Sequence, residues 1–250
     1  MKLHFTVASS AGMVRENNED MALLVGAFYR DDADVLPPVT LSPESRFCAV
    51  VADGMGGYEG GEVASEMVLH SLDSFVSALP HGVRAEDVMS EMKTHWLAEA
   101  TAEMLAAASA DSRLVSMGTT LTGFIFIDGR VLLVNAGDSR VYRLRDGFLR
   151  QMTVDHSLRQ LTGDMSQPSN VIYNAIGLQE SFIDVTDVTS RIAVGDRYII
   201  CSDGLCDMLD DDETAAVSAS PAAASDIVSA ACRAGGADNV TVITVDICSE

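Results

Sequence analysis

The feature that most constrains the fold of this chain is a succession of short β-rich runs, interrupted by two long helical patterns. Each run is alternating or continuously apolar and is bounded by turn-forming residues, which is typical of strands. The nine runs span residues 3–8, 21–29, 47–52, 119–127, 131–135, 140–144, 182–188, 197–201 and 240–246. Nine strands in 250 residues predict an extensive system of β-sheets.

The two helical patterns cover residues 61–79 and 85–109, and Pro80, His81 and Gly82 separate them. A short break of this kind predicts a helical hairpin. A last helix is expected to begin near Pro221, whose fixed φ suits a first helical turn, and to end before Gly235. The helices are thus grouped apart from most of the strands.

This grouping predicts an α+β fold with mainly antiparallel sheets and helices packed outside them. Asp128-Gly129 stands between two adjacent β runs and Asp146-Gly147 follows another, and we interpret both pairs as the turns of β-hairpins. No Pro-, Gly- or Ser-rich linker divides the sequence. We therefore expect a single domain over residues 1–250.

The charge of the chain limits the partners that it can bind. The formal net charge is −21, from 37 acidic and 16 basic residues, so the phosphate backbone of a nucleic acid would be repelled. There is no apolar run of about 18 residues, and polar residues interrupt the N-terminal stretch, so neither a membrane span nor a signal peptide is expected. We expect a cytoplasmic protein that binds neither nucleic acid nor membrane.

The five cysteines are scattered and contain no CxxC pair, so we interpret them as reduced, structural residues. Cys201 and Cys206 flank a strand end, with no neighbouring base in the sequence that would lower a thiol pKa.

Four acidic positions follow or precede β runs. They are Glu19 with Asp20, Asp53 before Gly54, Asp203 before Gly204, and Asp238 before Asn239. A single Asp-Gly pair is most simply a turn. Folding could instead bring all four positions to one rim of the sheets, where their oxygen atoms would suit Mg²⁺ or Mn²⁺.

Longer strings around these acids favour the second interpretation. They are Arg15-Glu16-Asn17-Asn18-Glu19-Asp20, Asp53-Gly54-Met55-Gly56-Gly57, Gly61-Glu62-Val63-Ala64-Ser65, Gly118-Thr119-Thr120, Gly137-Asp138-Ser139-Arg140, Asp155-His156-Ser157-Leu158, Cys201-Ser202-Asp203-Gly204-Leu205 and Gly236-Ala237-Asp238-Asn239-Val240-Thr241. In this order they resemble the bacterial metal-dependent serine/threonine protein phosphatases of the type 2C family. The resemblance implies a four-layer αββα sandwich, in which two mainly antiparallel sheets are flanked by helix pairs.

The resemblance also implies a centre of two Mn²⁺ or Mg²⁺ ions. Asp53 would bridge the ions, Glu19 and the Gly54 carbonyl would complete one shell, and Asp203 and Asp238 would hold the other ion. A hydroxide shared by the metals would attack phosphorus without a phosphoenzyme.

Three further residues receive roles from the same resemblance. Arg15 would grip the substrate phosphate, Asp20 would orient coordinated waters from behind the ligands, and Asn239 would support the ligands. A third ion has weak support, because Ser116 and Met117 precede Gly118 where many bacterial relatives carry an aspartate.

The general acid stays unassigned. Met55 and Tyr58 occupy places where some relatives carry histidine, and His156 is interpreted as a residue that anchors a loop. The run Asp210–Glu213 is interpreted as a solvated helix N-terminus rather than a metal site.

The predicted function is hydrolysis of phosphoserine and phosphothreonine in proteins. The partners expected for a monomer of this kind are a phosphoprotein substrate and a cognate Ser/Thr kinase in bacterial signalling. The alternative is a pseudophosphatase or regulatory binding module on the same fold, and retention of all four acidic ligands argues against it.

Overall fold

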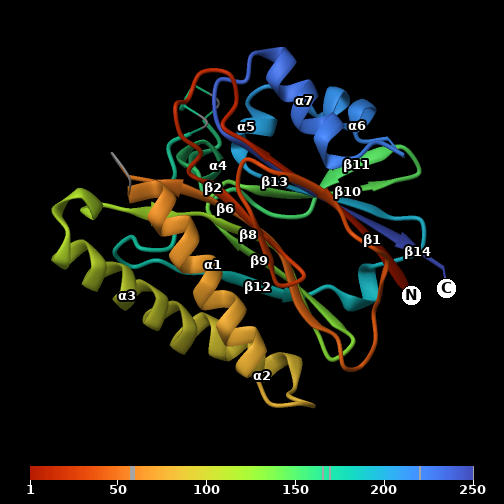
Figure 1. The fold of residues 1–250 in the computed structure, drawn as a ribbon, viewed down its shortest axis with the longest axis horizontal. Coiled ribbons are helices and arrows are strands. Elements are labelled where there is room, and N and C mark those ends of the chain that lie inside the picture. Colours follow the sequence, from red (N-terminus) through yellow and green to blue (C-terminus); the bar gives the residue numbers. More distant parts are fainter. Residues whose placement is uncertain (57–59, 165, 169, 220, 250) are drawn as a thin grey trace.

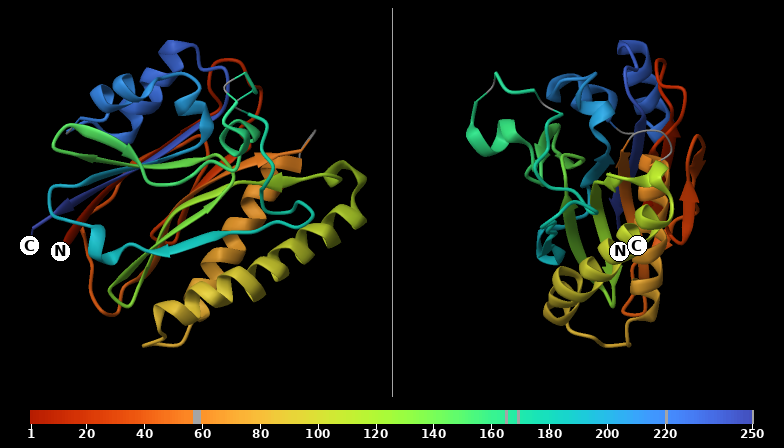
Figure 2. Two further views of the ribbon diagram at one scale, coloured as in Figure 1. Left: turned by 180° about the vertical axis from the view of Figure 1, so that it is seen from behind. Right: turned by 90° about the vertical axis from the view of Figure 1, so that its left-hand side faces the viewer.

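The computed structural model describes residues 1–56, 60–164, 166–168, 170–219 and 221–249 (Figure 1). Two seven-stranded sheets lie at the centre, and all strand pairs in both are antiparallel. Helices cover the outer face of each sheet (Figure 2). The predicted four-layer α+β sandwich is confirmed.

The first sheet has the order β11-β10-β13-β14-β1-β4, with β5 also paired to β1. Its strands are β1 (Lys2–Ser10), β4 (Ala33–Val35), β5 (Val39–Thr40), β10 (Arg140–Arg145), β11 (Phe148–Gln151), β13 (Arg197–Cys201) and β14 (Val240–Cys248). β1 and β14 pair along nine residues, from Lys2 opposite Cys248 to Ser10 opposite Val240. The first and last strands of the fold therefore lie side by side in the middle of this sheet.

The second sheet has the order β12-β9-β8-β6-β2-β3, and β7 pairs with the end of β6. Its strands are β2 (Asp20–Leu24), β3 (Ala27–Tyr29), β6 (Arg46–Met55), β7 (Gly118–Thr119), β8 (Leu121–Ile127), β9 (Arg130–Ala136) and β12 (Asp184–Asp187). The central strands β6 and β8 are almost continuously apolar and buried, because both faces of this sheet are covered.

The core between the sheets is built around aromatic side chains. Phe5 of β1 meets Phe47 and Phe126 edge-on, with ring centroids 5.9 and 6.1 Å away, and Phe47 stacks on Phe126 at 4.6 Å. Burying each such ring stabilises the fold by about 1.5–3 kcal/mol relative to exposure. This contact fixes one sheet on the other across the sandwich.

A helical layer packs on the second sheet. It consists of α1 (Gly60–Ala78), α2 (Ala85–Glu91), a π-helical turn η1 (Met92–Trp96) and α3 (Leu97–Ala110). The buried side chains of α1, which include Val68, Leu69 and Leu72, join the core of the second sheet. The predicted helical hairpin is confirmed, with the π-helical turn as an addition that its periodicity did not indicate.

The opposite layer packs on the first sheet and contains α5 (Asp203–Cys206), α6 (Asp211–Val217) and α7 (Ala224–Ala234). Asp210 caps α6 through the Glu213 N–H at 2.8 Å, and Glu213 accepts the Asp210 N–H in return, so the predicted helix N-terminus is confirmed. The helix expected near Pro221 begins later, at Ala224, because Ala223 is extended and its N–H donates to Asp226.

The remaining helical segments are α4 (Leu158–Thr162), η2 (Ser112–Leu114) and η3 (Thr189–Arg191). No helix in the described part of the chain has the length and apolar character needed to cross a membrane.

All nine predicted β runs contain strands, but two are divided. Residues 21–29 form a β2–β3 hairpin that turns at Val25 and Gly26, where φ is 50° and 78°. Residues 119–127 divide into β7 and β8, which pair with different parts of β6. Both predicted Asp-Gly turns have positive φ at each residue, at 128–129 and at 146–147, as type I′ hairpin turns require.

Candidate metal centre

One wall of the site is made by β2 and β6. Their register places Asp20 directly opposite Asp53. The Asp53 N–H donates to Thr120 Oγ1 at 3.0 Å, and the Asp53 carbonyl accepts from Thr119 Oγ1 and from the Thr120 N–H, both at 2.9 Å. Three hydrogen bonds from the Gly-Thr-Thr string therefore hold the backbone at Asp53.

The same wall depends on a close approach of two glycines. A β-carbon on Gly54 would lie 2.0 Å from the Gly61 carbonyl oxygen, so no other residue fits between β6 and the start of α1. The Glu19 carbonyl accepts from the Gly54 N–H at 3.2 Å and from Ser65 Oγ at 2.7 Å. These contacts fix Glu19 beside Asp53.

The opposite wall comes from β13 and β14. Asp203 follows β13, and Asp238 precedes β14 with its Oδ1 accepting the Asn239 N–H at 2.8 Å. The Asn239 side chain joins the two walls: its Oδ1 accepts the Glu19 N–H at 2.8 Å, and its Nδ2 donates to the Asn17 carbonyl at 2.9 Å. The predicted supporting role of Asn239 thus has a geometric basis.

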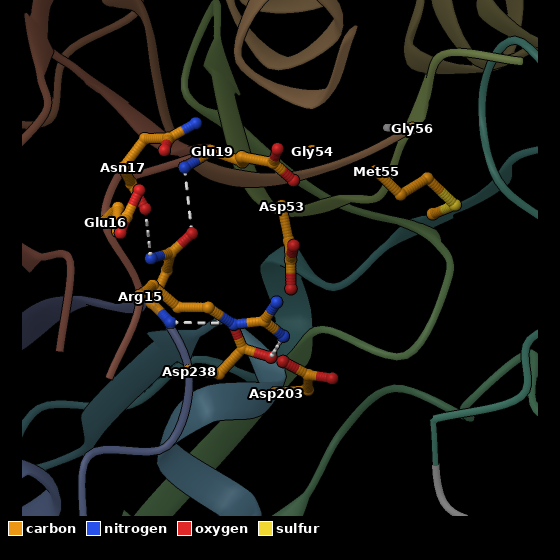
Figure 3. A pocket seen from close by; sticks show the side chains of 11 residues that line it. Arg15, Glu16, Asn17, Glu19, Asp53, Gly54, Met55, Gly56, Asp203 and Asp238 are labelled. Carbon is orange, nitrogen blue, oxygen red and sulfur yellow. Dashed lines mark hydrogen bonds and ion pairs between the residues drawn. The ribbon is translucent and has the colours of Figure 1, made fainter. Parts of the chain in front are cut away.

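Between these walls lies a cavity of about 540 Å³ (Figure 3). Its lining consists of Arg15, Glu16, Asn17, Glu19, Asp53, Gly54, Met55, Gly56, Asp203, Asp238 and Asn239. All seven site residues predicted to face substrate or metal, or to support a ligand directly, are in this lining. Asp20 is fully buried beneath it, where its Oδ2 accepts from Ser202 Oγ at 2.6 Å.

Arg15 brings positive charge to the mouth of this cavity. Its side chain is 55% exposed, and its guanidinium contacts Asp238 Oδ2 at 2.7 Å. Figure 3 shows the Arg15 guanidinium reaching across the cavity between Asp238 and Asp53. Arg15 is therefore placed to meet an anion that enters from solvent.

The crowding of carboxylates is electrostatically costly. Burial raises the pKa of Asp53 well above its usual range, and the charges of Asp20, Asp203 and Asp138 raise it further. Burial also raises the pKa of Asp20 to about 7, that of Asp203 to about 6 and that of Asp138 to about 7. A cation in the cavity would offset this cost.

The residues present fit a divalent cation in their chemistry. The acidic lining offers only oxygen donors, which Mn²⁺ and Mg²⁺ prefer, and the buried Asp20 Oδ1 has no hydrogen-bond partner in the described part of the chain. Among the described residues, however, no three Asp, Glu, His or Cys side chains are already arranged to hold an ion. In this arrangement Asp238 is paired with Arg15.

Several supporting residues received no role from the sequence. Asp138 is buried and acts on the pKa of Asp53, while Ser202 holds Asp20. Both residues lie inside the sequence strings that resemble the phosphatase family. Their position in those strings is the feature of the sequence from which a role could have been predicted. Tyr58 and Gly57 lie outside the described residues.

His156 anchors a loop, as predicted. It is buried and is not part of the cavity lining. Its Nδ1 accepts from the Gly137 N–H at 3.1 Å and contacts Asn174 Nδ2 at 2.8 Å, so the proton resides on Nε2, which faces Asp184 Oδ2 at 3.2 Å.

The protein is a double-sheet α+β sandwich. Its acidic cavity is lined by carboxylate oxygens and lies where strands of both sheets end. A family model described as protein phosphatase 2C matches residues 25–233. The chain therefore belongs to the protein phosphatase 2C family. The matched range omits Arg15, Glu19 and Asp238, but the relatives described next align with nearly the whole chain.

The chain is 34% identical to the serine/threonine protein phosphatase PstP of Mycobacterium tuberculosis over 98% of its length, and it spans 45% of that protein. It is 30% identical to the serine/threonine phosphatase stp of Listeria monocytogenes, over 98% of this chain and 96% of the relative. A crystal structure of the catalytic domain of PstP in complex with two manganese ions is similar, with a TM-score of 0.75, 31% identity and 99% coverage of both chains.

Proposed function

We propose that this protein is a protein-serine/threonine phosphatase that depends on two divalent ions, Mn²⁺ or Mg²⁺. The observation that carries the proposal is the gathering of Glu19, Asp53, Asp203, Asp238 and Arg15 around one cavity. The names of the relatives, and the two manganese ions in the PstP structure, support the same reaction.

Glu19, Asp53 and the Gly54 carbonyl would hold one ion, and Asp53, Asp203 and Asp238 would hold the other. Ions bound there would supply a water of lowered pKa as nucleophile and would neutralise the charge of the phosphoryl group. Among the described residues that line the cavity there is no Ser, Cys or His to form a covalent intermediate. Hydrolysis without a phosphoenzyme is consistent with that lining.

The protein's own side chains position the reactants. Arg15 carries donors in a planar fork that matches two oxygens of a phosphate. It would become available to a phosphate if Asp238 held a metal instead of the Arg15 guanidinium. Asp20 and Asn239 hold the ligands from behind through Ser202 and Glu19. Loss of either support would loosen the site without removing a ligand.

The proposal extends to the setting of the reaction. Residues 1–250 would form one catalytic domain that acts as a cytoplasmic monomer on phosphoproteins made by a separate Ser/Thr kinase. The match to the stp phosphatase of Listeria monocytogenes, which runs along 98% of this chain, supports the single catalytic domain.

The test uses purified protein with p-nitrophenyl phosphate and with a phosphothreonine peptide. We expect hydrolysis with Mn²⁺ or Mg²⁺, its loss after exhaustive EDTA treatment, and its return when metal is added back. A phosphotyrosine peptide serves as the control and should be the poorer peptide substrate. Undiminished activity in EDTA would overturn the metal role, and inactivity with every metal would favour the alternative of a binding module.

A further inference from the structure

The β10–β11 hairpin forms one edge of the first sheet (Figure 1). Residues of this hairpin line a second charged cavity, which shares no residue with the acidic one. Its volume is also about 540 Å³. Its lining consists of Arg143, Arg145, Arg150, Met152, Ser190, Arg191, Ile192 and Ala193. Four arginines around one cavity are unexpected in a chain of net charge −21.

Strand register brings three of these arginines together. Arg143 of β10 stands directly opposite Arg150 of β11, and Arg145 is two residues further along β10, on the same face. Like charges placed directly opposite each other destabilise an antiparallel pair. The fourth, Arg191, arrives from η3, whose backbone carbonyl at Arg191 accepts from Arg145 Nη2 at 3.0 Å.

The face that carries these arginines is the inner face of the sheet. Val141, two residues before Arg143, belongs to the core between the sheets, and Met152 and Ile192 pack against the same core. The arginines therefore lie where this core ends. The lining of the cavity therefore combines the apolar side chains of Met152, Ile192 and Ala193 with four arginines.

Most arginines in the described part of the chain are paired with acids, but three of the four that line this cavity are not. Among the described residues, five of the 14 arginines have no carboxylate within salt-bridge distance: Arg143, Arg150, Arg159, Arg191 and Arg233. Three of those five line this one cavity. Only Arg145 is paired there, with Asp196.

The acid that pairs with Arg145 is already engaged by other groups as well. Asp196 is buried, and its Oδ2 also accepts from Tyr198 Oη at 3.0 Å and from the Ala193 N–H at 2.9 Å. Arg143 Nε is buried and has no hydrogen-bond partner in the described part of the chain. A buried donor left in this state destabilises the fold, so internal hydrogen bonding does not explain the placement of Arg143.

We infer that the cavity lined by Arg143, Arg145, Arg150 and Arg191 is a phosphoryl-binding site separate from the acidic cavity. Guanidinium groups bind phosphate through paired N–H donors, and several of them around one concavity fit a dianion better than a single carboxylate. The ligand is either inorganic phosphate or a phosphorylated residue of a bound polypeptide.

The position of the site suits a second phosphorylated residue on a substrate, an extension that rests on the proposed function. Arg143 is five residues beyond Asp138, which lies beside the acidic cavity, and a strand rises about 3.3 Å per residue. The two sites are thus separated by about 15–25 Å, which about six extended residues can span. A doubly phosphorylated segment could occupy both.

The first test is calorimetric titration of inorganic phosphate into EDTA-treated protein at low ionic strength. The double variant Arg150→Ala, Arg191→Ala removes two exposed guanidinium groups, and Arg84→Ala, Arg233→Ala removes two exposed guanidinium groups elsewhere. We expect binding that weakens about 10-fold or more in the first variant and is retained in the second. Equal binding in the first variant and the wild type, or equal weakening in both variants, would overturn the inference.

The second test distinguishes the two sources of the phosphoryl group. With Mn²⁺ present, kcat/KM is compared for peptides with one phosphothreonine and with two, six residues apart, each relative to p-nitrophenyl phosphate. A preference for the doubly phosphorylated peptide that disappears in Arg150→Ala, Arg191→Ala identifies a phosphorylated polypeptide. Phosphate binding without that preference identifies inorganic phosphate. If no substrate is hydrolysed at all, the proposed function fails while the calorimetric result still decides the site.

Discussion

The acidic cavity is lined by five carboxylates and one arginine, whereas the arginine cavity has four arginines and no carboxylate in its lining. Their volumes are the same, about 540 Å³, so charge and not space distinguishes them. Fixed guanidinium groups can hold an anion but cannot supply a nucleophile. Carboxylates cannot hold an anion unless cations lie between them, and such cations also activate water. We therefore expect the arginine cavity, lined by Arg143, Arg145, Arg150 and Arg191, to bind an anion without catalysing a reaction. We expect the acidic cavity to bind a phosphoryl group and also to hydrolyse it.

The largest effect should come from Asp53, which would be shared by both ions. Asp53→Asn removes that shared charge, and we expect turnover to fall by about 10³-fold or more, with loss of tight metal binding. Metal titration by calorimetry beside steady-state kinetics measures both quantities. Retained metal affinity and turnover would place the metal centre on other residues. The acidic cavity, like the arginine cavity, would then be a site without catalytic activity.

A smaller effect is expected from Asp238, which would contact one ion only. Asp238→Asn should lower turnover by about 10- to 100-fold at low Mn²⁺, and high Mn²⁺ should restore part of it, because mass action refills a weakened site. The measurement is activity as a function of Mn²⁺ concentration. A loss that no Mn²⁺ concentration relieves would show that Asp238 does more than hold one ion.

Arg15 is the one cationic side chain among the described residues that line the acidic cavity, and we propose that it binds the substrate phosphate. Arg15→Ala should raise KM for a phosphopeptide by about 10-fold, the value of one charge-assisted hydrogen bond of about 1.5 kcal/mol. Metal affinity should persist or increase, because the substitution frees Asp238 from its 2.7 Å ion pair. Weaker metal binding in this variant would mean that Arg15 organises the ligands instead of the substrate.

The smallest effect concerns stability without metal. The pKa of Asp20 and that of Asp138 are raised to about 7, and the pKa of Asp203 to about 6, so the folded state binds more protons than the unfolded chain between pH 4 and 7. Stability from these groups is complete at low pH and is lost as pH rises through 6 to 7. We expect the Tm of EDTA-treated protein to fall by about 3–5 °C from pH 5.5 to pH 8.

Mn²⁺ should abolish that decrease, because ions replace the protons that the carboxylates lose. The acids whose pKa is lowered, such as Asp128 and Asp196, change stability only below pH 4 and do not interfere. Thermal scans at three pH values with and without Mn²⁺ make the measurement. A Tm that rises with pH in EDTA would contradict the electrostatic description of the acidic cavity.

The acidic cavity could be predicted from the sequence, and the arginine cavity could not. Arg15, Glu19, Asp53 and Asp238 each lie in a string that resembles a known family, so the sequence alone predicts their convergence. Arg143 is an ordinary strand position in the sequence, and Arg150 lies outside the predicted β runs. Only the register of β10 with β11, a strand too short to be recognised, places them opposite each other.

The same limit applies to the cysteines. Cys201 and Cys206 were expected to have no neighbour that lowers a thiol pKa. In the structure their sulfur atoms are 3.8 Å apart, and the pKa of Cys206 is lowered, first by the hydrogen bond with Cys201 and then by the charge of Arg140. Arg140 is more than 60 residues away in the sequence from Cys206, so periodicity carried no information about this contact.

The pairing of β1 with β14 has a consequence for the order in which the acidic cavity is assembled during synthesis. Arg15 and Glu19 leave the ribosome early, but Asp238 and Asn239 are made more than 200 residues later, and β14 must then insert between β1 and β13. Until that strand arrives, the first sheet is open in its middle and one wall of the acidic cavity does not exist. The catalytic site that we propose is therefore formed only when the fold is completed.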